Sequence, residues 1–161
     1  MRNLSTPLTI LCLFALLSTS AAQQPPKYGE PISLDDAKKV MAAAEKEAAK
    51  EDWPVSIAIV DSTGYLVMFQ RLENSHLGSV EIALEKAKGV ALFRRPTKVF
   101  QDTIEGGGAG LRMLRFPAIP LEGGVPIIVE GKLIGAVGVS GVKSNQDAQV
   151  AEAGIKALVE D

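Results

Sequence analysis

Two pairs of apolar segments, each folded about a short polar turn, restrict what this chain can form more than any other feature. The first pair lies in residues 55–70 (VSIAIVDSTGYLVMFQ), with the turn at Asp61–Gly64. The second lies in residues 126–139 (PIIVEGKLIGAVGV), around the two-residue turn Glu130-Gly131. The sequence therefore predicts two β-hairpins, and the continuous apolar run of the first predicts burial on both faces.

Amphipathic helices are predicted on either side of these hairpins. Helical periodicity begins at Ser33, near Ser79 and at Ser144, and an aspartate follows the first and the last of these serines by three residues, at Asp36 and Asp147. The first helix has one apolar stripe, formed by Leu34, Ala37, Val40, Met41, Ala44 and Ala48. The middle helix has a mostly small inward face, formed by Val80, Ala83, Leu84, Ala87 and Ala91. Such a face allows close packing on a sheet or on another subunit.

The order of the elements is helix, hairpin, helix, irregular segment, hairpin, helix. Two hairpins joined through a helix favour an α+β domain with an antiparallel sheet and helices packed on it. A doubly wound parallel sheet would need single strands alternating with helices. The sequence predicts one domain over residues 33–161.

The irregular segment, residues 94–119, begins where Pro96 ends the middle helix. A short helix is predicted over Thr97–Thr103, and residues 106–110 (GGGAG) are predicted to be a flexible tract or lid. This tract lacks the Lys-Ser/Thr ending of a P-loop and does not follow a strand in a βαβ unit, so a nucleotide site is not indicated.

The N-terminal residues 1–22 have the pattern of a secretory signal peptide, because a ten-residue apolar run (LTILCLFALL) precedes small residues. Residues 23–32 are predicted to be a flexible lead-in. We expect export to the periplasm or the exterior, with no stable membrane span after cleavage. Cys12 is the chain's one cysteine and lies in the signal, which excludes disulfides, thiolate catalysis and covalent haem attachment in the mature protein. A net charge of −2 gives no electrostatic footprint for nucleic acid.

Three stretches resemble the GlcG/HbpS family, which includes the C-terminal domain of PduO-type proteins: IAIVDSTGYLVMFQRLE, SVEIALEKAKGVALFRRPT and GGVPIIVEGKLIGAVGVSG. They occur in the family's order and extend over nearly all of the chain after Ser33. The resemblance implies a five-stranded antiparallel sheet and a homo-oligomer. It also implies noncovalent haem binding or haem breakdown in some members, and a place beside glycolate or diol metabolism in others.

The only histidine, His76, lies in the polar loop before the middle helix. A neutral imidazole is a common ligand of haem iron and of transition metals. The alternative is an exposed loop histidine without a partner. Structural zinc is disfavoured because it takes several Cys or His ligands.

Further residues are candidates to hold an anionic or iron-containing ligand. Met113 with Arg112 and Arg115 follows the glycine tract, and offers one soft ligand and two cations; alternatively, the segment's apolar residues only pack it down. Arg71 ends a strand near His76 and is a partner for a propionate or an ordinary strand-end charge. Lys86 would neutralise the carboxylate or propionate of an anionic ligand. Alternatively, its long side chain would cover an oligomer interface and pair with a carboxylate of the protein such as Glu81.

Haem scavenging, buffering or sensing, with slow oxidative haem breakdown as a side activity, is the leading hypothesis from these observations. The alternatives are an accessory protein or enzyme acting on a small hydroxy-acid-like anion, and a purely self-assembling structural module. Nucleophilic catalysis has no support, because there is no GxSxG motif and no cysteine after the signal.

Overall fold

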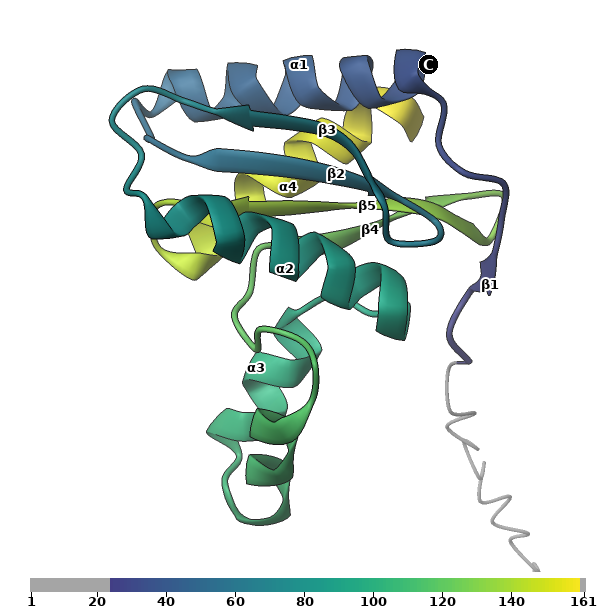
Figure 1. Cartoon of the computed structure of the whole chain (residues 1–161), viewed down its shortest axis with the longest axis vertical. Helices are drawn as coiled ribbons and strands as arrows, with labels where there is room; N and C mark the ends of the chain where they lie inside the picture. Colours follow the sequence, from purple (N-terminus) through teal and green to yellow (C-terminus); the bar gives the residue numbers. More distant parts are fainter. Residues whose placement is uncertain (1–23, 160–161) are drawn as a thin grey trace, which may run out of the picture.

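Five strands form one sheet with helices on both faces in the computed structural model, which describes residues 24–159 (Figure 1). The strands are β1 (Lys27–Tyr28), β2 (Ser56–Asp61), β3 (Leu66–Arg71), β4 (Gly124–Val129) and β5 (Lys132–Ser140). The helices are α1 (Leu34–Lys50), α2 (Gly78–Phe93), α3 (Lys98–Glu105), the 3₁₀ helix η1 (Gly108–Arg115) and α4 (Ser144–Val159). The single α+β domain predicted from the sequence is confirmed; the expected signal peptide lies outside the described residues.

The sheet is antiparallel apart from one short strand. β5 pairs antiparallel with both β2 and β4, and β2 pairs antiparallel with β3. β1 runs parallel to β5, with Lys27 opposite Lys132 and Tyr28 opposite Leu133, beyond the point where β2 has turned away at Asp61. The sequence predicted a flexible lead-in over these residues and no strand.

Both predicted hairpins are present. Glu130 and Gly131 have φ values of 50° and 72°, as a two-residue turn between twisted strands requires. In the first hairpin the turn is closed by Asp61, whose Oδ1 accepts hydrogen bonds from the N–H groups of Thr63 (2.8 Å) and Tyr65 (3.1 Å). Burial on both faces is correct for β2 but wrong for β3, because β3 lies at the edge of the sheet and is only half-buried.

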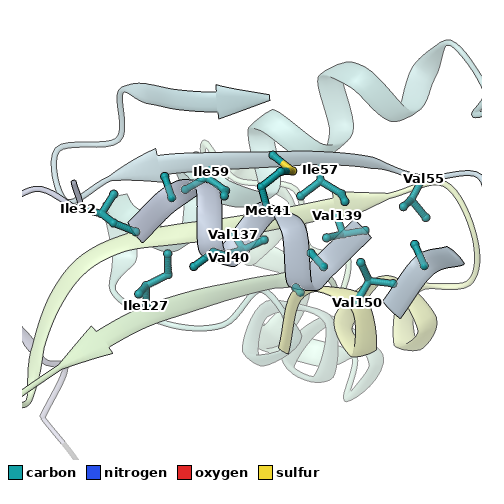
Figure 2. Close-up of a cluster of buried hydrophobic side chains, with 14 residues drawn as sticks. Ile32, Val40, Met41, Val55, Ile57, Ile59, Ile127, Val137, Val139 and Val150 are labelled. Carbon is teal, nitrogen blue, oxygen red and sulfur yellow. The ribbon is translucent and has the colours of Figure 1, made fainter. Parts of the chain in front are cut away.

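One face of the sheet is covered by α1 and α4 and holds the larger core (Figure 2). The predicted capping serine is confirmed, since Ser33 Oγ accepts a hydrogen bond from the Asp36 N–H at 3.1 Å. The predicted stripe of α1 is buried except for Leu34, which is 52% exposed. The stripe packs on branched aliphatic side chains of the strands, including Ile57, Ile59, Ile127, Val137 and Val139.

The opposite face is covered by α2, which lies very close to the sheet, as its small residues predicted (Figure 1). A Cβ placed on Gly138 of β5 would lie 2.0 Å from the backbone oxygen of Ala83 and 2.6 Å from the backbone nitrogen of Ala87. The helix backbone therefore rests on a glycine of the central strand. None of the helices in the described part of the chain combines the length and the apolar character needed to cross a bilayer.

The arm, which we define as residues 98–115, consists of α3, a glycine turn and η1 and projects away from the sheet below α2 (Figure 1). The predicted short helix is confirmed as α3. The tract predicted to be flexible instead forms a turn, with Gly107 and Gly108 at positive φ (68° and 54°), and then the start of η1. Only residues that tolerate positive φ allow such a reversal.

Candidate ligand-binding site

His76 occupies the loop between β3 and α2 and is exposed. Its neighbour Leu77 is 80% exposed, so an imidazole and a large apolar side chain reach solvent side by side. The ring folds back toward the start of the helix, where a Cβ on Gly78 would lie 3.4 Å from His76 Nδ1. This loop therefore presents a nitrogen ligand beside an apolar surface.

The backbone under His76 is held by buried serines. The carbonyl oxygen of His76 accepts hydrogen bonds from the Ser79 N–H (3.0 Å) and the Ser79 hydroxyl (2.6 Å). Ser79 Oγ also lies 2.8 Å from Ser56 Oγ of β2, and both serines are buried. On the preceding turn, the Ser75 hydroxyl donates to the Leu72 carbonyl at 2.8 Å. The loop is thus anchored to the central sheet, and this fixes the position of the His76 backbone from which the imidazole extends.

The other predicted ligand contacts come from two different elements, β3 and η1. Arg71 is the exposed last residue of β3, close to His76 along the chain. Arg112 and Arg115 are exposed on η1, and Met113 between them is half-buried. The four hollows described below are lined by none of these residues, nor by His76. None of these four hollows therefore joins the His76 loop to Met113, and the roles of the individual residues stay predictions.

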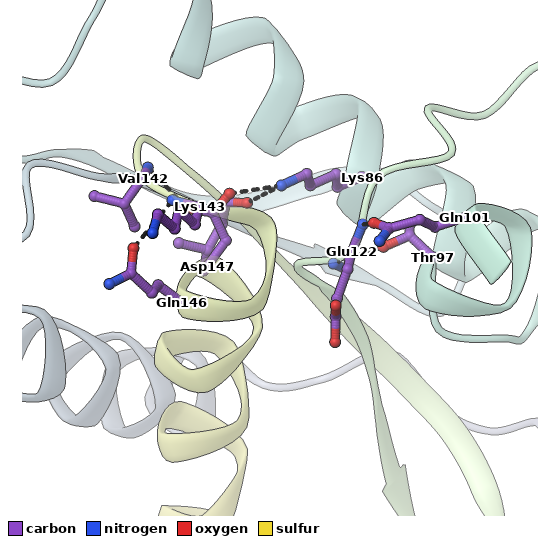
Figure 3. A network of polar contacts seen from close by, with 10 residues as sticks. Lys86, Thr97, Gln101, Glu122, Val142, Lys143, Gln146 and Asp147 are labelled. Carbon is purple, nitrogen blue, oxygen red and sulfur yellow. Dashed lines mark hydrogen bonds and ion pairs between the residues drawn. The ribbon is translucent and has the colours of Figure 1, made fainter. Parts of the chain in front are cut away.

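Lys86 is buried inside the protein, with its side chain 1% exposed (Figure 3). Its Nζ donates to the carbonyl oxygen of Val139 at 2.8 Å and to Asp147 Oδ2 at 2.9 Å. Asp147 is 3% exposed on its side chain, and its Oδ1 accepts from the Val142 N–H at 3.2 Å. The expected partner Glu81 was wrong: it is exposed, whereas Lys86 points into the interior and joins α2 to the start of α4.

Burial governs the ionisation of this pair. Burial lowers the pKa of Lys86, and the charge and hydrogen bond of Asp147 offset only part of that change. Burial likewise raises the pKa of Asp147, against the opposing effect of Lys86. The chain leaves little space here: a Cβ on Gly123, which has φ of 120°, would lie 2.7 Å from Lys86 Nζ. Lys86 is therefore an internal cation whose ammonium group is already engaged by Asp147 and the Val139 carbonyl.

The largest of the four hollows has a volume of about 620 Å³ and lies between β1, the β2–β3 turn and the second half of α2. Tyr28, Ala91, Leu92 and Pro117 give it an apolar wall. The Tyr28 hydroxyl donates to the Ala91 carbonyl at 2.9 Å, and Lys88 on the rim pairs with Glu85 at 3.5 Å. The hydroxyl of Tyr28 thus fastens β1 to α2.

Three smaller hollows differ in position and in the charged residues that line them. One of about 380 Å³ lies among the end of α1, Trp53 and the end of β3 and is lined by acids without a basic residue. Another of about 470 Å³, between α1 and α4, is lined by three lysines and two glutamates. The third, of about 230 Å³, lies between the base of the arm and Gly123-Gly124.

A protein-only metal centre is not formed in residues 24–159, where no group of three or more His, Cys, Asp or Glu side chains is placed to hold an ion. A single exposed imidazole is instead suited to an iron that a porphyrin already holds.

Comparison with known proteins assigns the chain to a family. A family model described as "Haem degrading protein HbpS-like" matches residues 32–156. This chain belongs to the HbpS-like family. Protein GlcG of Escherichia coli strain K12 is 40% identical to it over 110 residues, which are 68% of this chain and 81% of GlcG.

Solved structures agree with this HbpS-like assignment. A crystal structure of a PduOC–haem complex matches with a TM-score of 0.72 and 30% identity, over 79% of this chain and 94% of that one. The crystal structure of HbpS matches with a TM-score of 0.73 and 27% identity, over 86% and 98% of the two chains. The resemblance inferred from the three sequence motifs is confirmed.

Two residues of structural importance were missed from the sequence. Asp147 was taken for a helix-start residue, because it follows Ser144 by three; its spacing from Lys86, 61 positions along the chain, gave no signal of a pair. Tyr28 lay in a polar, proline-rich stretch that predicted no structure.

Proposed function

We propose that this HbpS-like protein is exported and binds haem noncovalently, in haem scavenging, buffering or sensing. The observation that carries the proposal is the similarity to the PduOC–haem complex, at 30% identity and over most of both chains. The description of the matching family model, a haem-degrading protein, supports the same ligand class. Slow oxidative breakdown of the bound haem is the second part of the proposal.

His76 is the proposed axial ligand. It is the only histidine of the chain, it is exposed, and its backbone is anchored to β2 through Ser79. Exposed Leu77 beside it supplies an apolar surface for a porphyrin face. When bound, the haem would supply the iron and its redox chemistry; the chain would hold it, orient it and neutralise its propionates.

Arginines, and not Lys86, are the proposed propionate partners. Arg71 is exposed and five positions before His76, whereas Lys86 is buried and already bound to Asp147. Met113 with Arg112 and Arg115 stays the alternative ligand segment. The engagement of Lys86 with Asp147 also weakens the hydroxy-acid alternative, in which Lys86 and Arg71 together would hold the anion.

Hemin titration of the purified protein tests the proposal. At micromolar protein we expect a shifted Soret band that saturates, and a changed band position in His76→Ala because the axial ligand is lost. Met113→Ala is the matched control and should keep the wild-type spectrum. Absence of a shifted band in the wild-type protein would refute haem binding; an unchanged spectrum in His76→Ala would move the ligand to Met113 or a tyrosine.

Export is tested separately. N-terminal sequencing of the protein from a periplasmic or culture-medium fraction should begin after Ala22. Recovery of the intact N-terminus from the cytoplasm alone would remove the exported role and leave the haem proposal standing.

A further inference from the structure

The arm has apolar side chains that residues 24–159 leave exposed. No residue of η1 is buried. Leu111 is 48% exposed, Leu114 is 63% exposed, and Phe116 just beyond the arm is 43% exposed. Arg112 and Arg115 alternate with the leucines and are also exposed. The outer part of the arm is therefore an apolar surface carrying two cations.

The base of the arm is firmly fixed. The ring of Phe93 stacks on Phe116 with centroids 5.5 Å apart and meets Phe100 edge-on at 5.3 Å. Thr97 exchanges two hydrogen bonds with Gly124 of β4, at 2.9 Å and 3.0 Å. Little conformational freedom would be lost if the arm were bound, so its binding cost is low.

The acidic groove, which we define as the 380 Å³ hollow lined by Glu45, Ala48, Ala49, Asp52, Trp53, Pro54, Leu72, Glu73 and Asn74, has the opposite character. Trp53 and Leu72 are half-buried apolar side chains of its lining. Three carboxylates also line it, and no lysine or arginine does. Each of the other three hollows contains at least one lysine in its lining.

We propose that the arm of one copy of this chain docks in the acidic groove of a second copy. Leu111 and Leu114 would cover Trp53 and Leu72, while Arg112 and Arg115 would face Glu45, Asp52 and Glu73. The apolar contact supplies most of the affinity, because exposed ion pairs contribute little each. The charges supply orientation and selectivity.

The arm and the groove are different surfaces, so the contact permits more than one closed assembly. Two copies can exchange arms reciprocally about a two-fold axis, or each copy can offer its arm to one neighbour and its groove to another, which closes into a ring or extends into a chain. The inference does not depend on whether the chain binds haem, and it goes beyond the expectation of an oligomer by naming the two surfaces.

Trp53 makes the contact directly observable. It is the only tryptophan of the chain and lines the groove, so its fluorescence reports on this surface alone. Docking would remove water from the indole and place an arginine near a ring that favours cations. Its emission should therefore move to shorter wavelength as protein concentration rises.

The experiment combines sedimentation velocity with Trp53 emission over a concentration series. The arm variant is Arg112→Glu/Arg115→Glu, and the groove variant is Glu45→Arg/Glu73→Arg; Asp52 is kept because its φ of 53° disfavours a longer side chain. We expect assembly to weaken by at least about tenfold in each variant. The chain carrying all four substitutions should assemble again, because the charges are exchanged.

A control matched to the arm variant carries the same change in net charge elsewhere. Lys38→Glu/Lys39→Glu alters two exposed lysines of α1 and should leave assembly and emission as in the wild type. A wild-type protein that stays monomeric with constant Trp53 emission would overturn the proposal. Binding of the arm to anionic lipid vesicles by such a monomer would assign the exposed apolar and basic residues to a membrane surface instead. Assembly that is indifferent to the arm and groove variants would likewise overturn the proposal.

Discussion

The two faces of the sheet are packed in different ways. The face under α1 and α4 is filled by large aliphatic side chains, such as Met41, Ile57 and Ile59. The face under α2 is filled mainly by alanines and valines, and the helix backbone approaches the strand closely at Gly138. Stability on the first face depends on large side chains that fill the space between helix and sheet. On the second face it depends on small residues that let the helix backbone approach the strand.

One ion pair connects the two faces. Lys86 comes from α2, and Asp147 from the first turn of α4 on the opposite side. Both charges are removed from water, so each depends on the other. The ion pair thus links α2 to α4, a connection that the alanines of α2 cannot make.

The largest effect is expected from breaking this link. Asp147→Ala would leave the Lys86 ammonium buried without its counter-charge and should lower the free energy of unfolding by about 3–5 kcal/mol. Urea denaturation followed by circular dichroism measures the loss. The double variant Lys86→Met/Asp147→Leu should recover most of it, because no charge is then left buried. A loss below about 1 kcal/mol in Asp147→Ala would show that water reaches the lysine.

Removing volume from the face under α1 and α4 should have the next largest effect. Met41→Ala deletes a side chain that is 1% exposed and should cost about 2–5 kcal/mol, because the surrounding aliphatic side chains cannot fully close the cavity. Thermal or urea unfolding measures the change. Leu34→Ala, on the same helix but 52% exposed, is the control and should cost much less. Equal losses in the two variants would contradict the described core.

Adding volume to the face under α2 should have a smaller but clear effect. Gly138→Ala places a methyl group against backbone atoms of Ala83 and Ala87, so α2 must shift and about 1–3 kcal/mol should be lost. Gly106→Ala is the control: its added Cβ would meet only ordinary contacts, at 3.5 Å from Thr103 O and 3.6 Å from Asp102 O. If Gly138→Ala were as stable as the control, α2 would lie farther from the sheet than described.

Local patterns gave most of the fold. Hairpin turns such as Glu130-Gly131 and the capping serine Ser33 act over a few residues, so the sequence contains their whole cause. The small face of α2 likewise predicted close packing. β3 was misjudged because an apolar run does not tell whether a strand is central or at an edge.

Contacts between distant segments could not be predicted in this way. The Lys86–Asp147 pair and the fastening of Tyr28 depend on which elements meet in space, and no local pattern encodes that. For the candidate site, the sequence identified His76 as a lone imidazole, and the structure adds its exposure and its serine anchors. The sequence could not predict that Lys86 points inward, because the alternation of small and charged residues along α2 permits either direction.

β1 has a practical consequence for the extent of the domain. Tyr28 bonds to the carbonyl of Ala91, and Arg94 lies 5.0 Å from the centre of its ring while also donating to the Pro26 carbonyl. A shortened protein that begins at residue 32, where the family match starts, would leave the first residues of β5 paired on the β4 side only and would open the end of α2 to solvent. Truncation for biophysical work should therefore stop upstream of Pro26, and an affinity tag is better placed at the other terminus.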